Sequence, residues 1–106
     1  MPKYLIAANY VGEGIKGLLK EGGSGRREAI EKLVKSVGGT VEGIYYALGE
    51  TDVYVIVDMP DNASVAGLSL VVNASGAATA KTVVLMTPEE MDEATKKTVD
   101  YRPPGQ

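Results

Sequence analysis

The sequence predicts an α+β domain with elements in the order β-α-β-β-α-β, followed by one more helix. Three observations lead to this fold class. The 106-residue chain contains four apolar runs of strand length. The second and third runs are separated only by a short turn, as in a hairpin. Segments with helical spacing connect the first run to the second and the third to the fourth, which is the ferredoxin-like arrangement with a four-stranded antiparallel sheet.

The first strand is predicted over Lys3–Asn9, and a pattern of helical spacing follows it. Glycines at Glu21–Gly25 interrupt that pattern. Ser24 is the candidate N-cap of the second helical segment, because its hydroxyl can accept a hydrogen bond from a free backbone N–H. Gly38–Gly39 ends this segment in the manner of a C-cap. We therefore expect one helical connection with a kink at the glycine-rich break.

The two central strands are predicted over Thr40–Leu48 and Asp52–Met59, because both runs are rich in β-branched and aromatic residues. A proline then stops the sheet. Asp61 or Asn62 is expected to cap the second crossover helix, which we place over Ala63–Ser75.

The fourth strand is predicted over Ala78–Met86, and the start of the last helix follows it directly. Thr87 is the expected N-cap, Pro88 the first helical residue, and Glu90 the third, which together form a capping box with a favoured proline. Prolines prevent further helix in the tail, so residues 100–106 are expected to be extended.

The composition excludes several classes of function. A net charge of −3 and the lack of a basic stripe argue against nucleic-acid binding. The chain has no cysteine and no histidine, which removes thiolate chemistry and the commonest general base and metal ligand. We therefore expect no metal site and no cofactor. With no signal peptide and no apolar run long enough for a membrane, we expect a cytoplasmic single domain over residues 1–106.

Both faces of the predicted sheet are apolar in part. In the third strand the alternate residues Val53, Val55 and Val57 are expected to face the helices, whereas the opposite set is mixed. In the second strand neither set is polar: Ile44, Tyr46 and Leu48 alternate with Val41, Tyr45 and Ala47. Because an uncovered apolar face would be a large exposed patch, we expect a homodimer closed as an α/β barrel, or a higher homo-oligomer. The alternative is a monomer whose last helix and tail cover this face.

Several segments spread over the chain have a characteristic order and spacing. They are Asn9-Tyr10, "GGSGRREA", Tyr45-Tyr46, "GETDVYVIVDMPDN", "NASGAATAKT", "TPEEM" and "YRPPG". In these segments the chain resembles the GYD-domain family of small bacterial and archaeal proteins. The resemblance implies a ferredoxin-like fold and a dimeric α/β barrel, and it implies no particular reaction. The chain departs from the Gly-Tyr-Asp pattern: Gly49 and Asp52 are present, but Thr51 stands where the tyrosine is expected and Glu50 is inserted.

Two glycine-rich segments are candidate anion sites. The segment Gly12–Gly17 spells G-x-G-x-x-G, but no acidic residue stands about 20 residues further on, so we reject a dinucleotide site. The second candidate is an anion nest formed by Ser24, Arg26 and Arg27 at a helix start. The favoured alternative is a solvated break in which the arginines pair with nearby glutamates.

A pocket on the inner, mixed face of the sheet is the third candidate. It would be lined by Tyr10, Tyr45, Tyr46, Asp52, Tyr54 and Lys81. Tyrosine and a partly buried carboxylate can exchange protons once burial shifts their pKa values, and a lysine can stabilise an anion. The alternative is an ordinary subunit interface.

No convincing catalytic constellation is present, so we favour a non-catalytic homo-oligomeric module that binds a small apolar ligand or a protein partner. One alternative is a cofactor-independent enzyme, monooxygenase-like or isomerase-like, which rests only on analogy with other dimeric α/β barrels. The other alternative is a structural protein that forms a larger closed assembly.

Overall fold

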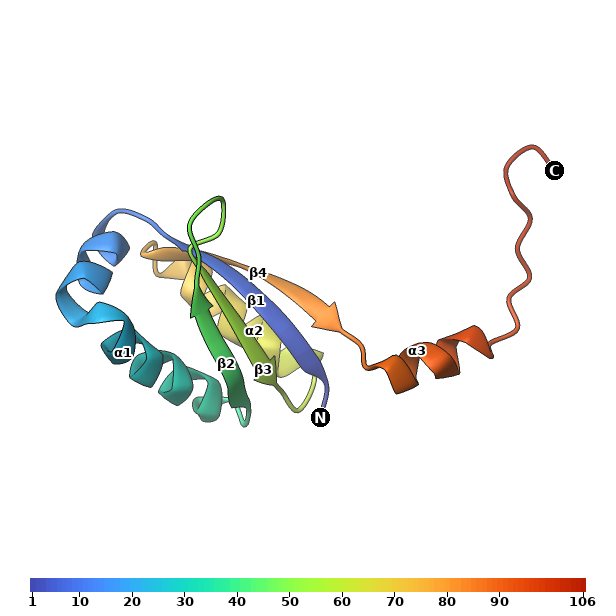
Figure 1. Ribbon diagram of the computed structural model, residues 1–106, viewed down its shortest axis with the longest axis horizontal. Helices are drawn as coiled ribbons and strands as arrows, with labels where there is room; N and C mark the ends of the chain where they lie inside the picture. Colours follow the sequence, from blue (N-terminus) through green and yellow to red (C-terminus); the bar gives the residue numbers. More distant parts are fainter.

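The computed structural model describes residues 1–106 and confirms the predicted α+β order (Figure 1). Its elements are β1 (Lys3–Tyr10), α1 (Glu13–Ser36), β2 (Thr40–Tyr46), β3 (Val53–Asp58), α2 (Asn62–Ala74), β4 (Ala78–Leu85) and α3 (Pro88–Thr95). The strands form one antiparallel sheet in the order β2-β3-β1-β4. This order follows from the topology, since each crossover through a helix leaves space for a strand in between.

Most local signals for helix ends are confirmed, but the predicted N-cap at Ser24 is wrong, because the non-helical residue is Gly22 and Ser24 lies within the helical part of α1. Gly22 breaks α1 with a φ of 74° and a ψ of 172°, which a residue with a side chain rarely adopts. Asp61 caps α2, because its Oδ1 accepts from the Ser64 N–H at 2.8 Å. At α3, Thr87 Oγ1 accepts from the Glu90 N–H at 3.1 Å, and Glu90 Oε1 accepts from the Thr87 N–H at 3.0 Å.

The core lies on the side of the sheet that faces α1 and α2. The three valines of β3 are buried there as predicted, and Val34 of α1 and Leu68 of α2 pack in the same cluster. The remaining buried members are Tyr4, Ile6, Met59 and Val65. Both crossover helices therefore cover one face of the sheet, and they leave the other face without a helix.

A β-bulge in β2 corrects the predicted alternation of that strand. The register shifts between Val41 and Gly43, so that Val41 opposes Val57 while Ile44 opposes Val55. The extra residue turns Val41 to the helix side, together with Ile44 and Tyr46, and not to the side of Tyr45 as predicted. The strand also ends before the predicted boundary, and Leu48 lies fully exposed in the following loop.

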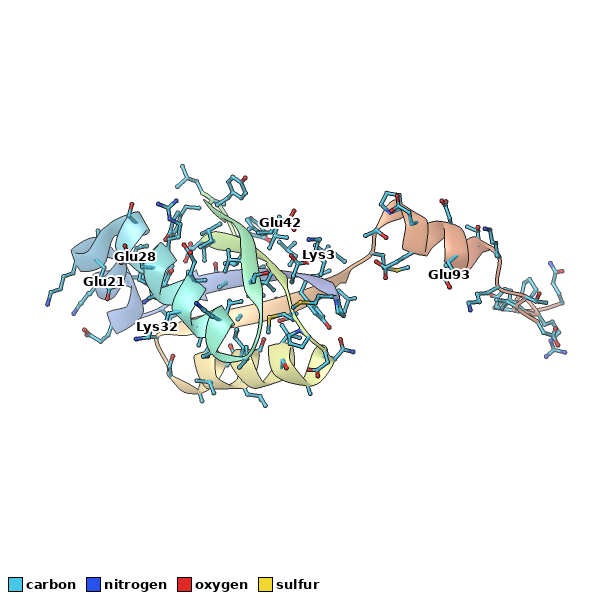
Figure 2. All side chains as sticks on the ribbon, turned by 90° about the horizontal axis from the view of Figure 1, so that it is seen from below. Lys3, Glu21, Glu28, Lys32, Glu42 and Glu93 are labelled. Carbon is cyan, nitrogen blue, oxygen red and sulfur yellow. The ribbon has the colours of Figure 1, made fainter.

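The face opposite the helices, which we call the open face, has an apolar centre. Leu5 lies there between Ile56 of β3 and Val83 of β4. At one end Lys3 pairs with Glu42 and, at 2.9 Å, with Asp58. Figure 2 shows Lys3 and Glu42 on the side of the sheet away from α2. Hydrogen bonds to these two carboxylates, Glu42 first, raise the pKa of Lys3.

The last 21 residues, Met86 to Gln106, project from the domain as an arm (Figures 1 and 2). Every residue of the arm is exposed, including those of α3. The radius of gyration of 16.9 Å exceeds the roughly 13 Å expected for a compact chain of this length. The arm does not cover the open face, so the alternative in which it does is wrong for this structure. None of the helices has the length and apolar character needed to cross a membrane.

Candidate functional site

Two adjacent cavities lie between the sheet and the crossover helices. The outer cavity has a volume of about 370 Å³, within the range of small-molecule sites, and the inner one of about 70 Å³. The outer cavity is walled by the first part of α1, the end of α2 and the start of β4. The inner cavity is almost entirely apolar, and Arg26 is its one charged lining residue. Both cavities share four lining residues, which are Tyr10, Arg26, Val72 and Ala78.

The glycine-rich start of α1 sets the position of the outer wall. A Cβ on Gly14 would lie 1.8 Å from the carbonyl oxygen of Ala77, so only glycine allows this approach. The neighbouring Val11 N–H donates to the same carbonyl at 3.0 Å. A Cβ on Gly17, in contrast, would meet no atom within 4 Å. The packing of α1 against the α2–β4 connection therefore explains why position 14 is a glycine, but it does not explain Gly17.

Tyr10 is held at the end of β1 by the aspartate that precedes β3. The Tyr10 N–H donates to Asp52 Oδ2 at 2.9 Å, at a position where the β1–β3 pairing has ended. The Asp52 N–H in turn donates to the Asn9 side chain at 2.8 Å and to the Ala8 carbonyl at 3.1 Å. The Asp52 carboxylate thus satisfies the Tyr10 backbone N–H and holds the end of β1 against the start of β3.

Arg26 lies where the two cavities meet. Its guanidinium carbon is 5.9 Å from the centre of the Tyr10 ring, a cation–π arrangement. Its Nη1 lies 3.6 Å from Glu21 Oε2, which is an ion pair beyond hydrogen-bond distance. Its Nε is buried and has no hydrogen-bond partner, a situation that costs about 1–3 kcal/mol for a buried donor. Interaction with the Tyr10 hydroxyl raises the pKa of Arg26, so the guanidinium stays charged.

Tyr46 connects the break in α1 to strand β2. Its hydroxyl donates to the Gly23 carbonyl at 3.1 Å, and a Cβ on Gly23 would come within 3.2 Å of the Tyr46 ring. Burial, followed by the proximity of Tyr10, raises the pKa of Tyr46. Tyr46 is therefore a neutral hydrogen-bond donor at neutral pH.

The residues proposed for an inner-face pocket fall into two groups. Tyr10 and Tyr46 point to the helix side, near Arg26. Tyr45 and Tyr54 oppose each other on the open face, and Lys81 joins them there through its pairing with Ala7. The separation follows from alternation along each strand, because neighbouring tyrosines at positions 45 and 46 must face opposite ways.

The three residues proposed as an anion nest also diverge. Arg26 turns toward Tyr10 and Glu21, whereas Arg27 Nε lies 4.0 Å from Glu31 on the outer surface of α1. Ser24 lines a separate shallow pocket together with Arg27 and Tyr46.

Sequence reasoning missed most of the residues that line the outer cavity, among them Glu13, Glu21, Val71 and Val72. The two valines have the spacing of ordinary core residues, and only the distance between α1 and α2 shows that they border a cavity. No three acidic side chains come together in a way that would hold a metal ion.

Comparison with known proteins gives one match. The family model described as the GYD domain matches residues 4–95, which is most of the chain. No curated protein and no solved structure matches the sequence. The match begins in β1 and ends with α3, so it includes the whole sheet and both crossover helices. The chain therefore belongs to the GYD domain family.

Proposed function

We propose that this protein is a homo-oligomeric module that binds a small apolar molecule between its sheet and its crossover helices. The observation that carries this proposal is the pair of cavities that share Tyr10 and Arg26. The inner cavity is lined almost entirely by apolar side chains, which suits an apolar body, and Arg26 lines both cavities, which suits orientation of that body by a polar group.

The hydrogen bonds of Tyr46 and Asp52 agree with a role in binding rather than in catalysis. Tyr46 is neutral, with its pKa raised by burial, and its hydroxyl donates to a backbone carbonyl. The Asp52 carboxylate is engaged by a backbone N–H and supports Tyr10. Neither residue lines the two cavities, which favours a binding role over general-base catalysis.

The open face supports a homodimer. Val83 is 48% exposed and Tyr54 is 37% exposed, although both lie on a four-stranded sheet beside Leu5 and Ile56. A second copy that places its own open face on this one would bury both through a self-complementary contact. An interface of about 800 Å² per partner is usual for a specific association.

The arm gives a second reason to expect a partner. The helix α3 has eight residues, and isolated helices shorter than about 12 residues are marginal in water. The arm also exposes Met91, Val99 and Tyr101, which are 53%, 75% and 69% accessible. Packing of the arm against a second copy would bury these side chains and stabilise the helix.

The oligomer is tested by light scattering and native mass spectrometry on the purified chain. We expect twice the chain mass of 11.1 kDa, or a higher multiple. Ile56→Asp on the open face should give a monomer, whereas Leu70→Asp on the outside of α2, at a position 71% exposed, should leave the oligomer intact. A folded wild-type monomer would disprove the oligomeric part of the proposal.

Binding is tested with a neutral probe of the expected size. Titration of the ¹⁵N-labelled chain with toluene should shift the amide resonances of Val72 and Ala78, which line both cavities. Resonances of α3 serve as the internal control, since that helix lies away from the cavities. Absence of shifts at the cavity residues up to the solubility limit of toluene would disprove the binding role.

A further inference from the structure

The one cation that lines both cavities is Arg26, and its guanidinium is not fully hydrogen-bonded by the protein. Arg26 is the one charged residue that lines the inner cavity, and its Nε is buried without a partner. We infer that the ligand is a small apolar monocarboxylate whose oxygens accept hydrogen bonds from Arg26. This inference rests on the proposed binding function and specifies the chemistry of its ligand.

The geometry of the guanidinium favours a carboxylate over other groups. Arginine presents its N–H donors as a planar fork that matches the two oxygens of a carboxylate. Glu21 contacts only Nη1, and at 3.6 Å it does not complete a hydrogen bond. Nε itself is occluded, so the terminal Nη nitrogens of the partly exposed side chain remain for a ligand. An apolar ligand without an acceptor would take no hydrogen bond from these terminal nitrogens, and an ammonium group would be repelled by the guanidinium.

The surroundings of Arg26 hold its cation in place. The Tyr10 ring lies beside the guanidinium, and Tyr10 itself is fixed by the hydrogen bond between its N–H and Asp52. A cation that is positioned before the ligand arrives loses less conformational freedom on binding. The apolar body of the ligand would then contact Val71, Val72 and Ala77 across the outer cavity.

Two carboxylates near the outer cavity restrict the charge of the ligand. Glu13 is paired with Lys16 at 3.2 Å, so its field is partly neutralised. Glu21 shares the Arg26 cation, so a bound carboxylate would compete with it. One additional negative charge can be balanced by Arg26, but a second one would meet Glu21, and this is why we infer a monoanion.

The experiment compares three probes of similar size on the full-length chain, which are benzoate, toluene and benzylamine. Dissociation constants come from ¹⁵N-resolved NMR titrations, which also report the side-chain Nε–H resonance of Arg26. We expect benzoate to bind about tenfold more tightly than toluene, which corresponds to one additional charge-assisted hydrogen bond. Benzoate should also shift the Arg26 Nε–H resonance, while benzylamine should bind no better than toluene.

Two variants and one control locate the effect. Arg26→Gln should lower the affinity for benzoate about tenfold and so remove the preference of the site for benzoate over toluene, since it removes the cation but keeps polar character. Glu21→Gln should tighten benzoate binding by removing the competing carboxylate, and this variant leaves Arg26 in place if Arg26→Gln fails to fold. Arg27→Gln is the matched control, because Arg27 pairs with Glu31 outside the cavity.

The outcomes distinguish this inference from the function on which it rests. Binding of toluene without any preference for benzoate would overturn the carboxylate inference and leave the binding role intact. Absence of binding by all three probes would overturn both. A benzoate preference that persists in a folded Arg26→Gln protein would assign the anion to another site and overturn the inference.

Discussion

Two glycines of the G-x-G-x-x-G segment should respond in opposite directions to the same substitution. In Gly14→Ala the added Cβ would lie 1.8 Å from the Ala77 carbonyl oxygen, roughly 1.5 Å closer than an ordinary contact. That oxygen belongs to the backbone, so α1 must move away from it. The movement weakens the hydrogen bond from the Val11 N–H to the same oxygen. In Gly17→Ala the new methyl group meets nothing within 4 Å.

The magnitudes follow from these contacts. Overpacking costs about 1–3 kcal/mol and the weakened hydrogen bond about 1 kcal/mol, while alanine regains about 1 kcal/mol of helix propensity. We expect Gly14→Ala to destabilise the protein by about 2 kcal/mol and to lower the melting temperature by about 10 °C. Gly17→Ala should stabilise it by about 1 kcal/mol and raise the melting temperature by about 5 °C.

Thermal unfolding followed by circular dichroism measures both effects under identical conditions. Because both variants replace a glycine of α1 by alanine, the difference between their melting temperatures cancels the general effect of that change in a helix. A Gly14→Ala protein that melts at or above the wild-type temperature would refute the close approach of α1 to Ala77. It would also remove the packing explanation for glycine at this position.

The remaining predictions concern caps and the support of Tyr10. Hydrogen bonds from the Ser64 hydroxyl and then its backbone N–H lower the pKa of Asp61, so its contribution to stability is present above the unfolded pKa of 3.8 and is lost as pH falls through the lower folded value. The difference in melting temperature between wild type and Asp61→Ala should therefore shrink as the pH is lowered below 3.8, and a constant difference would contradict this cap. Asp52→Asn keeps an acceptor for the Tyr10 N–H and should cost under about 1 kcal/mol, whereas Asp52→Ala should cost about 1–2 kcal/mol in urea unfolding. Thr87→Ala should weaken α3 by about 1 kcal/mol, seen as faster amide exchange in that helix with an unchanged melting temperature of the domain; unaltered exchange would show that the capping box is not formed in solution.

The predictions that the sequence alone determined are those that depend on neighbours along the chain. The capping box at Thr87, the cap at Asp61 and the break at Gly22 each involve residues within a few positions, so their geometry is set by local backbone preferences. The order of strands and helices follows from the spacing of apolar residues along the chain, and the antiparallel sheet follows from that order. The burial of Val53, Val55 and Val57 was predictable because side chains alternate between the two faces of a strand.

Only the tertiary structure decided how distant segments meet. Alternation predicts which face each residue of a strand occupies, but the bulge between Val41 and Gly43 reverses the faces by inserting a residue. Gly43 within the strand is the one local sign of this bulge, and it does not give the resulting register. The cluster of Tyr10, Arg26 and Tyr46 joins β1, α1 and β2 through contacts between residues far apart in the sequence.

The arm shows the same division between local and long-range information. Its helix was predictable from the capping box, because that signal lies within four residues of chain. Its position away from the sheet was not predictable, because it depends on where β4 ends and on the direction in which the chain leaves the domain. Composition and periodicity determine which residues form elements, whereas the faces and cavities arise only when those elements pack.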